Sequence, residues 1–169
     1  MPRDNIVLIG MPGSGKSTVG VLLAKVLGYD FVDTDLLIQL RESRTLEELL
    51  GERGIDGFLD IEGEVCGSLT AERTVIATGG SVIYRETAMR HLSEQGLVVY
   101  LQVELDELTA RLNDLAGRGV ALREGQTLAE LYAERIVLYE RWAEVTVREE
   151  SMNLAETLAA TAAALREYM

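Results

Sequence analysis

One short segment near the start of the chain constrains its fold more than any other. Residues 10–17 read GMPGSGKS, which matches the pattern GxxxxGK[ST], and they lie between an apolar run at 6–9 and a helical pattern at 19–27. In this context the pattern indicates a phosphate-binding loop, whose glycines let backbone N–H groups converge on phosphate oxygens at a helix N-terminus. The alternative is an ordinary glycine turn with a surface lysine, but the strand, the spacing and the helix all favour the loop.

Each part of this loop has an expected role in binding a nucleoside triphosphate. Lys16 is expected to reach the β- and γ-phosphates, and Ser17 to offer its hydroxyl to Mg²⁺. The residues expected to contact the nucleotide here are Gly13, Ser14, Gly15, Lys16, Ser17 and Thr18. The loop predicts a nucleotide site but does not by itself predict the reaction.

The charge of the chain limits its partners. The sequence has 28 acidic and 16 basic residues, a net charge of −12, so its surface repels nucleic acid and anionic lipid at long range. Only Lys16 and Lys25 are lysines. An anion site is therefore expected to be local, built from backbone N–H groups and a few arginines.

Cysteine, histidine and hydropathy exclude further classes of protein. The single cysteine, Cys66, and the single histidine, His91, exclude an intramolecular disulfide, a four-cysteine zinc site and a histidine-rich metal site. No apolar run approaches the ~18 residues of a membrane span, and the first residues do not resemble a signal peptide. We expect a cytoplasmic monomer with neither a nucleic-acid nor a membrane partner.

Apolar runs alternate along the chain with longer amphipathic stretches, which is typical of βα units around a parallel sheet. Five short strands are expected at residues 6–9, 31–32, 74–77, 97–101 and 145–147. Capping boxes at helix starts are expected at Thr45 with Glu48, Thr127 with Glu130, and Asn153 with Glu156. The pattern predicts one three-layer α/β domain over residues 1–169.

Two polar segments follow predicted strands, at the edge of the sheet where open α/β folds bind ligands. In Asp33-Thr34-Asp35, one carboxylate can bind the metal and the other can accept a proton from an attacking hydroxyl, or Asp35 can simply cap a helix. In Thr78-Gly79-Gly80-Ser81, the glycines let backbone N–H groups approach a ligand closely, or form a plain turn. Both segments are candidates for the site.

An arginine between two predicted helices is typical of a lid that closes over a bound nucleotide. Arg118 stands between glycines and is expected to lie on a mobile lid at about 115–125 that adds positive charge over ATP. The sequence has no Asn-Lys-x-Asp motif, which excludes a typical GTPase. A small-molecule kinase and a nucleotide-gated binding module without catalysis both stay open, and a nucleoside monophosphate kinase is less favoured because its lid usually carries several arginines.

The combined motifs resemble those of the shikimate kinases over nearly the whole chain. The resemblance rests on the phosphate loop, on residues 31–35, on Gly79-Gly80, on Arg118 and on residues 134–139. It implies a P-loop kinase fold with a five-stranded parallel sheet of order 2-3-1-4-5, ATP and Mg²⁺, and a small hydroxy-acid acceptor bound by a helical segment at about 35–70. The roles it implies are Asp35 as base, Lys16 and Arg118 in catalysis, Ser17 and Asp33 for Mg²⁺, Gly80 and Arg135 for the acceptor, and Arg111 and Arg118 for the nucleotide.

One departure from the family's pattern concerns the acceptor. Leu59 stands where the family has an arginine that grips the carboxylate of shikimate, so the pocket lacks one charge-assisted contact. Glu62 lies one helical turn later and needs a cation, either a protein side chain such as Arg44 or Arg53, or the ammonium of a substrate. Shikimate is thus the expected acceptor, and a hydroxy amino acid such as homoserine is the alternative. Ser81, in place of a third glycine, is a second departure.

Overall fold

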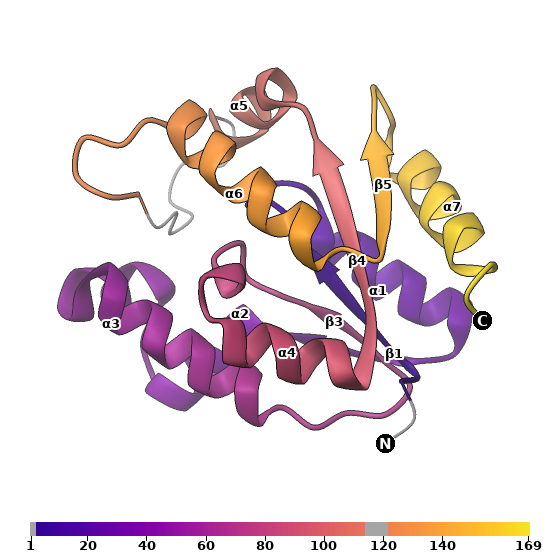
Figure 1. Cartoon of the computed structure of the whole chain (residues 1–169), viewed down its shortest axis with the longest axis horizontal. Helices are drawn as coiled ribbons and strands as arrows, with labels where there is room; N and C mark the ends of the chain where they lie inside the picture. Colours follow the sequence, from indigo (N-terminus) through magenta and orange to yellow (C-terminus); the bar gives the residue numbers. More distant parts are fainter. Residues whose placement is uncertain (1–2, 114–121) are drawn as a thin grey trace.

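The computed structural model of the chain describes residues 3–113 and 122–169. Five parallel strands form one sheet of order β2-β3-β1-β4-β5 (Figure 1). The strands are β1 (Asn5–Ile9), β2 (Asp30–Asp33), β3 (Thr74–Ala77), β4 (Gly96–Val103) and β5 (Val145–Glu149). This confirms the fold class, the strand positions and the strand order expected from the sequence.

Helices cover both faces of the sheet, which gives the three layers (Figure 1). They are α1 (Lys16–Leu27), α2 (Thr34–Glu42), α3 (Leu46–Ser68), the 3₁₀ turn η1 (Val82–Tyr84), α4 (Glu86–Gln95), α5 (Leu105–Asn113), α6 (Leu128–Trp142) and α7 (Leu154–Leu165). Within the described ranges, no helix is long and apolar enough to cross a membrane.

The central strand β1 is buried on both faces, as its continuous apolar sequence predicts. Val7 and Ile9 pack into the cluster that α4 and α6 cover, whereas Ile6 and Leu8 pack into the cluster that α1 and α7 cover. At the edge of the sheet, β5 alternates buried and exposed residues instead. This packing fixes β1, and so holds the loop that follows it at the carboxyl edge of the sheet.

The helix ends follow the expected chemistry, with two corrections. At the start of α6, Thr127 accepts the Glu130 backbone N–H, but the reciprocal bond that a capping box requires is not formed. Thr45 and Asn153 form the reciprocal capping boxes that their sequences predict, and Gly28 ends α1 in the left-handed conformation. At the start of α2, however, the capping residue is Asp33 and not Asp35. Asp35 lies inside the first turn of the helix, so the reading of Asp35 as a simple cap is wrong.

The segment 34–68 forms a small helical module beside the sheet (Figure 1). Its two helices pack around their own apolar cluster, which includes Ile38, Leu49 and Phe58. Helix α3 is bent at Gly54, whose φ of 68° lies in the left-handed region that favours glycine. The bend sets the direction of the second half of α3, which carries Glu62 along one wall of the site.

Candidate active site

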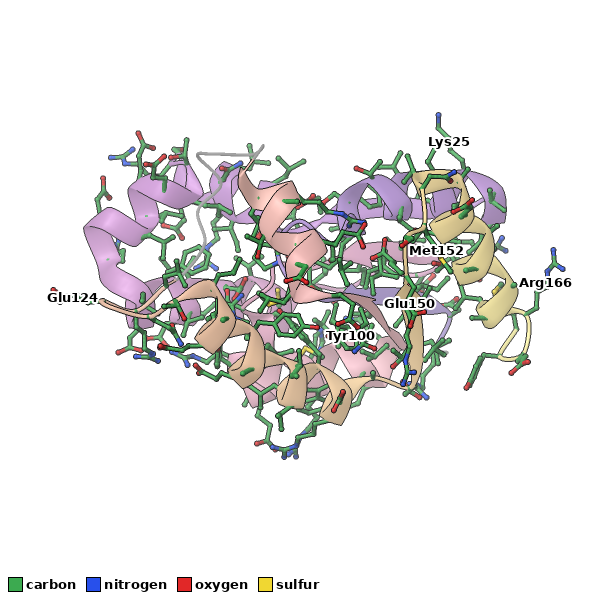
Figure 2. All side chains as sticks on the ribbon, turned by 90° about the horizontal axis from the view of Figure 1, so that it is seen from above. Lys25, Tyr100, Glu124, Glu150, Met152 and Arg166 are labelled. Carbon is green, nitrogen blue, oxygen red and sulfur yellow. The ribbon has the colours of Figure 1, made fainter. Side chains whose placement is uncertain are left out.

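A cavity of about 540 Å³ opens at the carboxyl edge of the sheet. Its walls come from the phosphate loop, the first turns of α2, the start and the middle of α3, the turn after β3, and Arg135 of α6. The cavity therefore brings together side chains from across the sequence, including most of the residues singled out above. Lys25, the other lysine, is exposed on the last turn of α1, and Figure 2 shows it pointing away from the body of the protein.

The phosphate loop has the backbone expected of an anion cradle. Gly15 caps α1 with a φ of 87°, a conformation that a side chain would strain. The buried Lys16 ammonium donates to the carbonyl oxygens of Gly10 at 2.7 Å and Met11 at 2.8 Å. These contacts hold the lysine over its own loop, at the N-terminus of a helix whose dipole favours negative charge.

A hydroxyl and a carboxylate meet at the head of α1. Ser17 donates its hydroxyl to Asp33 Oδ2 at 2.6 Å, while Asp33 Oδ1 accepts the backbone N–H groups of Asp35 at 2.9 Å and Leu36 at 3.3 Å. Asp33 thus ends β2, caps α2 and faces Ser17 at once. An oxygen pair of this kind suits Mg²⁺, which prefers oxygen ligands and is usually held by one or two carboxylates together with substrate phosphates.

Asp35 and Glu62 approach each other over Gly79. Asp35 Oδ1 and Glu62 Oε2 both lie closer than 3.0 Å to the position that a Cβ at Gly79 would occupy. A side chain at Gly79 would therefore collide with both carboxylates. The glycine is needed for this approach of the two carboxylates, which is a different reason from the approach of a ligand to backbone N–H groups that the sequence predicts.

Glu62 is the carboxylate whose surroundings differ most from expectation. It is 1% exposed, and its Oε1 accepts the hydroxyl proton of Ser81 at 2.7 Å. The pKa of Glu62 is raised to about 7. Burial is the largest cause and the Asp35 carboxylate adds to it, whereas the Ser81 hydroxyl, Arg135 and Lys16 act in the opposite direction. The expected attraction from a protein cation is present, but it comes from Arg135 and Lys16 and not from Arg44. Arg44 pairs with Glu52 instead.

Arg135 is fully buried on α6 and lines the cavity beside Gly80. Its Nε donates to the Tyr84 hydroxyl at 3.3 Å, and its guanidinium lies 5.3 Å from the centre of the Tyr84 ring. One turn along α6, the Tyr139 hydroxyl donates to the Gly80 carbonyl oxygen at 2.5 Å. Both tyrosines are functional candidates that sequence reasoning missed. Only Tyr139 had a signal, the four-residue spacing from Arg135 on one helix face.

The remaining predicted site residues lie in three different places. Leu59 is 2% exposed within the apolar cluster of the α2–α3 module and does not line the cavity, so the structure does not place it with the other acceptor residues. Arg111 of α5 donates to the Gly13 carbonyl oxygen at 3.1 Å, directly beside the phosphate loop. Arg118 and most of the expected lid at 115–125 lie outside the described residues.

Comparison with known proteins agrees with this geometry. The shikimate kinase family model matches residues 12–166. The chain is 41% identical over 143 residues to the shikimate kinase of Clostridium botulinum (strain Okra / Type B1), which covers 82% of this chain and 84% of that relative. It is also 38% identical over 140 residues to the shikimate kinase of Thermodesulfovibrio yellowstonii, and this match covers 81% of both chains.

Solved structures extend the match to the whole fold. The shikimate kinase from Acinetobacter baumannii in complex with shikimate is similar with a TM-score of 0.87 at 32% identity, over 98% of this chain and 93% of that one. The shikimate kinase from Aquifex aeolicus gives a TM-score of 0.77 at 26% identity, over 97% of both chains. The chain belongs to the shikimate kinase family.

Proposed function

We propose that the protein transfers the γ-phosphoryl group of ATP to the 3-hydroxyl of shikimate. The observation that carries the proposal is the shared cavity: a phosphate loop with its lysine, a carboxylate at Asp35 and a buried arginine at Arg135 line one space. Triphosphate, hydroxyl and carboxylate each find a matching group there. A nucleotide-gated module without catalysis would need neither Asp35 nor Arg135 in that space.

In the proposed reaction the acceptor hydroxyl attacks the γ-phosphorus. A new P–O bond forms, the hydroxyl proton passes to the Asp35 carboxylate, and the bond from the γ-phosphorus to the bridging oxygen breaks, so that ADP leaves. Lys16 and the loop N–H groups hold the β- and γ-phosphates. When bound, Mg²⁺ offsets the negative charge of the phosphate oxygens, and Ser17 and Asp33 are the residues that would hold it.

The acceptor is held by groups at two neighbouring points of the cavity. Arg135 is the buried arginine among the described lining residues, and we assign the substrate carboxylate to it. The Asp35 carboxylate lies close to the adjacent residue, Gly79, and we assign the reacting hydroxyl of the acceptor to Asp35. The α2–α3 module then acts as the acceptor-binding segment. On the nucleotide side we assign Arg111, because it already contacts the phosphate loop.

Homoserine as the acceptor gains no support from the structure or the comparisons. The argument for it required Glu62 to lack a protein cation, but Arg135 and Lys16 both act on Glu62. The neighbouring Asp60 pairs with Arg85. The relatives named above are all shikimate kinases. With Leu59 in place of the family's arginine, the acceptor side has one cation fewer. This difference does not create a need for a substrate ammonium.

The test is ADP release with MgATP and each acceptor in turn, together with identification of the product. We expect rapid, saturable turnover with shikimate, none with homoserine, and loss of turnover in Asp35→Asn with ATP binding retained. ADP release independent of any acceptor would contradict the proposal. We also infer that the protein acts as a cytoplasmic monomer, which light scattering and cell fractionation would test.

A further inference from the structure

The proposed reaction gives no role to Thr34, which stands between the proposed Mg²⁺ ligand Asp33 and the proposed base Asp35. Thr34 is the first residue of α2 and is 0% exposed. Its hydroxyl oxygen accepts the backbone N–H of Gly79 at 3.2 Å, in a contact that is itself buried. Burying a hydroxyl is costly unless it is hydrogen-bonded, so this contact is the reason that a polar side chain can lie there.

The contact between Thr34 and Gly79 lies just beyond the end of a strand pair. Strands β2 and β3 pair in parallel, and the last paired residues are Asp33 and Ala77. After Asp33 the backbone enters α2, so β3 loses its neighbouring strand at this point. The Thr34 side chain then bonds the turn after β3 where backbone pairing has stopped. It thereby joins the first turn of α2 to that turn.

The turn after β3 is in turn bonded to the strand that carries the phosphate loop. The backbone N–H of Thr78 donates to the Leu8 carbonyl oxygen at 3.2 Å, and the Thr78 hydroxyl donates to the same oxygen at 2.8 Å. Leu8 belongs to β1, and the phosphate loop starts at Gly10, two residues later. A short series of hydrogen bonds therefore connects the first turn of α2, through Gly79 and Thr78, to the base of the phosphate loop.

The proposed base lies on the same glycine that Thr34 bonds. Asp35 Oδ1 is 2.7 Å from the position that a Cβ at Gly79 would occupy. Two successive residues of α2 thus meet Gly79, Thr34 at its N–H and Asp35 at its Cα. A general base must lie within hydrogen-bond reach of the proton that it takes. A shift of α2 against Gly79 would move the Asp35 carboxylate away from a hydroxyl that must also face the phosphate.

The surroundings of the Thr34 hydroxyl are dry. Cys66 of α3, which is also 0% exposed, lies against Thr34. Burial raises the pKa of the Cys66 thiol, and a hydrogen bond with the Thr34 side chain lowers it. Because both residues are shielded from solvent, bulk water does not reach the Gly79 N–H. Removal of the Thr34 hydroxyl would therefore leave that N–H without a partner, which favours a shift of the turn or of α2.

We propose that Thr34 is a positioning residue for the proposed base, because its hydroxyl, bonded to the Gly79 N–H, fixes the Asp35 carboxylate relative to the phosphate loop. This inference rests on the proposed function. Thr34 itself contacts no substrate in this proposal and acts on the rate through Asp35. A misplacement of about 1 Å can cost on the order of 10²-fold in rate, so loss of the bond is expected to lower kcat about 10- to 100-fold.

The test removes the hydroxyl and keeps the shape of the side chain. In Thr34→Val, the kcat for phosphorylation of shikimate should fall by the stated factor, whereas the KM for MgATP and the KM for shikimate should stay within a few-fold of wild type. Thr34→Ser restores a hydroxyl and should recover most of the lost kcat. If Thr34→Val does not fold, Thr34→Ala takes its place, and the same loss of kcat is expected.

Two comparisons separate positioning of the base from a general loss of structure. Thr161→Val is the matched control, because Thr161 is another threonine at 0% exposure, whose hydroxyl donates to the Thr157 carbonyl oxygen within α7. It should leave kcat unchanged. The second comparison introduces Thr34→Val into Asp35→Asn. Because the base is already absent there, Thr34→Val should have almost no further effect on the residual kcat.

The outcomes distinguish this inference from the proposed function. If wild type does not phosphorylate shikimate, the proposed function fails and this inference fails with it. If wild type does phosphorylate shikimate, the inference alone is overturned when Thr34→Val keeps its kcat, or when it lowers kcat by the same factor with and without the Asp35 carboxylate. A higher Mg²⁺ requirement in Thr34→Val, with kcat unchanged at saturation, would also overturn it, because Thr34 would then act through Asp33.

Discussion

Two buried glutamates lie on opposite sides of the central strand, and they show how a neighbour changes the role of one residue type. Glu62 on α3 and Glu149 at the end of β5 are 1% and 3% exposed. Each accepts one hydroxyl, from Ser81 at 2.7 Å and from Thr157 at 3.1 Å. Each also has one oxygen without a hydrogen-bond partner among the described residues.

The difference lies in the nearest charge. The Arg111 guanidinium is 3.9 Å from Glu149, and the same arginine contacts the phosphate loop. Burial raises the pKa of Glu149, and Arg111 lowers it. Glu62, by contrast, has another carboxylate, Asp35, close by, as well as the more weakly acting cations Arg135 and Lys16. Glu149 is thus part of the scaffold that ties β5, α5 and α7 to the loop, whereas Glu62 lines the cavity beside the proposed base.

The largest expected effect separates Asp35 from its neighbour Glu62. Asp35→Asn keeps the shape of the side chain but removes the base, so kcat should fall about 10²- to 10⁴-fold with little change in ATP binding. Glu62→Gln should act mainly on the KM for shikimate. Steady-state kinetics with both substrates varied would check this division. A kcat for Asp35→Asn within a few-fold of wild type would mean that Asp35 is not the base.

The second prediction concerns stability and pH. Below about pH 4.5 Glu62 is protonated in both the folded and the unfolded chain, and between 4.5 and about 7 only the folded chain keeps the proton. A pKa raised on folding means that stability from this group is lost as pH rises through that window, by about 3 kcal/mol in total. Glu62→Gln should therefore become more stable relative to wild type on going from pH 5 to pH 8.

Urea unfolding of the unliganded protein at several pH values measures this difference. Asp60→Asn is the control, because its exposed carboxylate should give a difference that does not change over the same range. If the difference in unfolding free energy between Glu62→Gln and wild type does not change from pH 5 to pH 8, the Glu62 carboxylate is ionised in the folded chain over that whole range. It would then need a hydrogen-bond donor that the structure does not show. It would also remove the contrast with Glu149.

The third prediction tests the scaffold role of Glu149. Glu149→Gln weakens the hold on Arg111, and we expect the KM for ATP to rise about fivefold, equivalent to about 1 kcal/mol, with the KM for shikimate unchanged. Glu107→Gln is the matched comparison, because Glu107 pairs with the same arginine at 2.6 Å but is more exposed. Its effect should be smaller. An equal effect on both substrates would indicate a general loss of structure.

The comparison also shows where sequence reasoning reaches its limit. The phosphate loop, the strands and the caps at Thr45 and Asn153 follow from local patterns, and the structure confirms them. The contact between Glu62 and Ser81 does not follow from a local pattern, because the two residues are 19 positions apart and meet only when α3 packs on the turn after β3. The position of Leu59 in the apolar cluster depends on the direction of α3 after its bend at Gly54.

Arg135 shows the same limit on a smaller scale. The sequence places it on a helix, but its partner Tyr84 is 51 residues away in a 3₁₀ turn that no periodicity indicates. Burial of an arginine next to an aromatic face combines a hydrogen bond with a cation–π contact. The acceptor site therefore relies on tertiary contacts in which Tyr84, Ser81 and the two glycines between β3 and η1 all take part.

The smallest expected effect concerns Tyr84 as a positioning residue for Arg135. Tyr84→Phe keeps the ring under the guanidinium and removes only a long hydrogen bond of 3.3 Å, so the loss should be near the low end for such bonds, about 0.5 kcal/mol or twofold in the KM for shikimate. Tyr84→Leu also removes the cation–π contact and should cost a further 0.5–1 kcal/mol, roughly. Tyr132→Phe is the control, because the Tyr132 hydroxyl bonds the Val103 carbonyl oxygen away from the cavity.

A shikimate analogue whose carboxylate is replaced by a hydroxymethyl group completes this test. If Tyr84 acts through Arg135, the effect of both Tyr84 variants on KM should disappear with this analogue, since it offers the guanidinium no charge to bind. An effect of Asp35→Asn should persist, because we assign the reacting hydroxyl, and not the carboxylate, to Asp35. Loss of both effects together would mean that the carboxylate and hydroxyl ends of the acceptor are not bound independently, and that the two sides of Gly79-Gly80 work as one site.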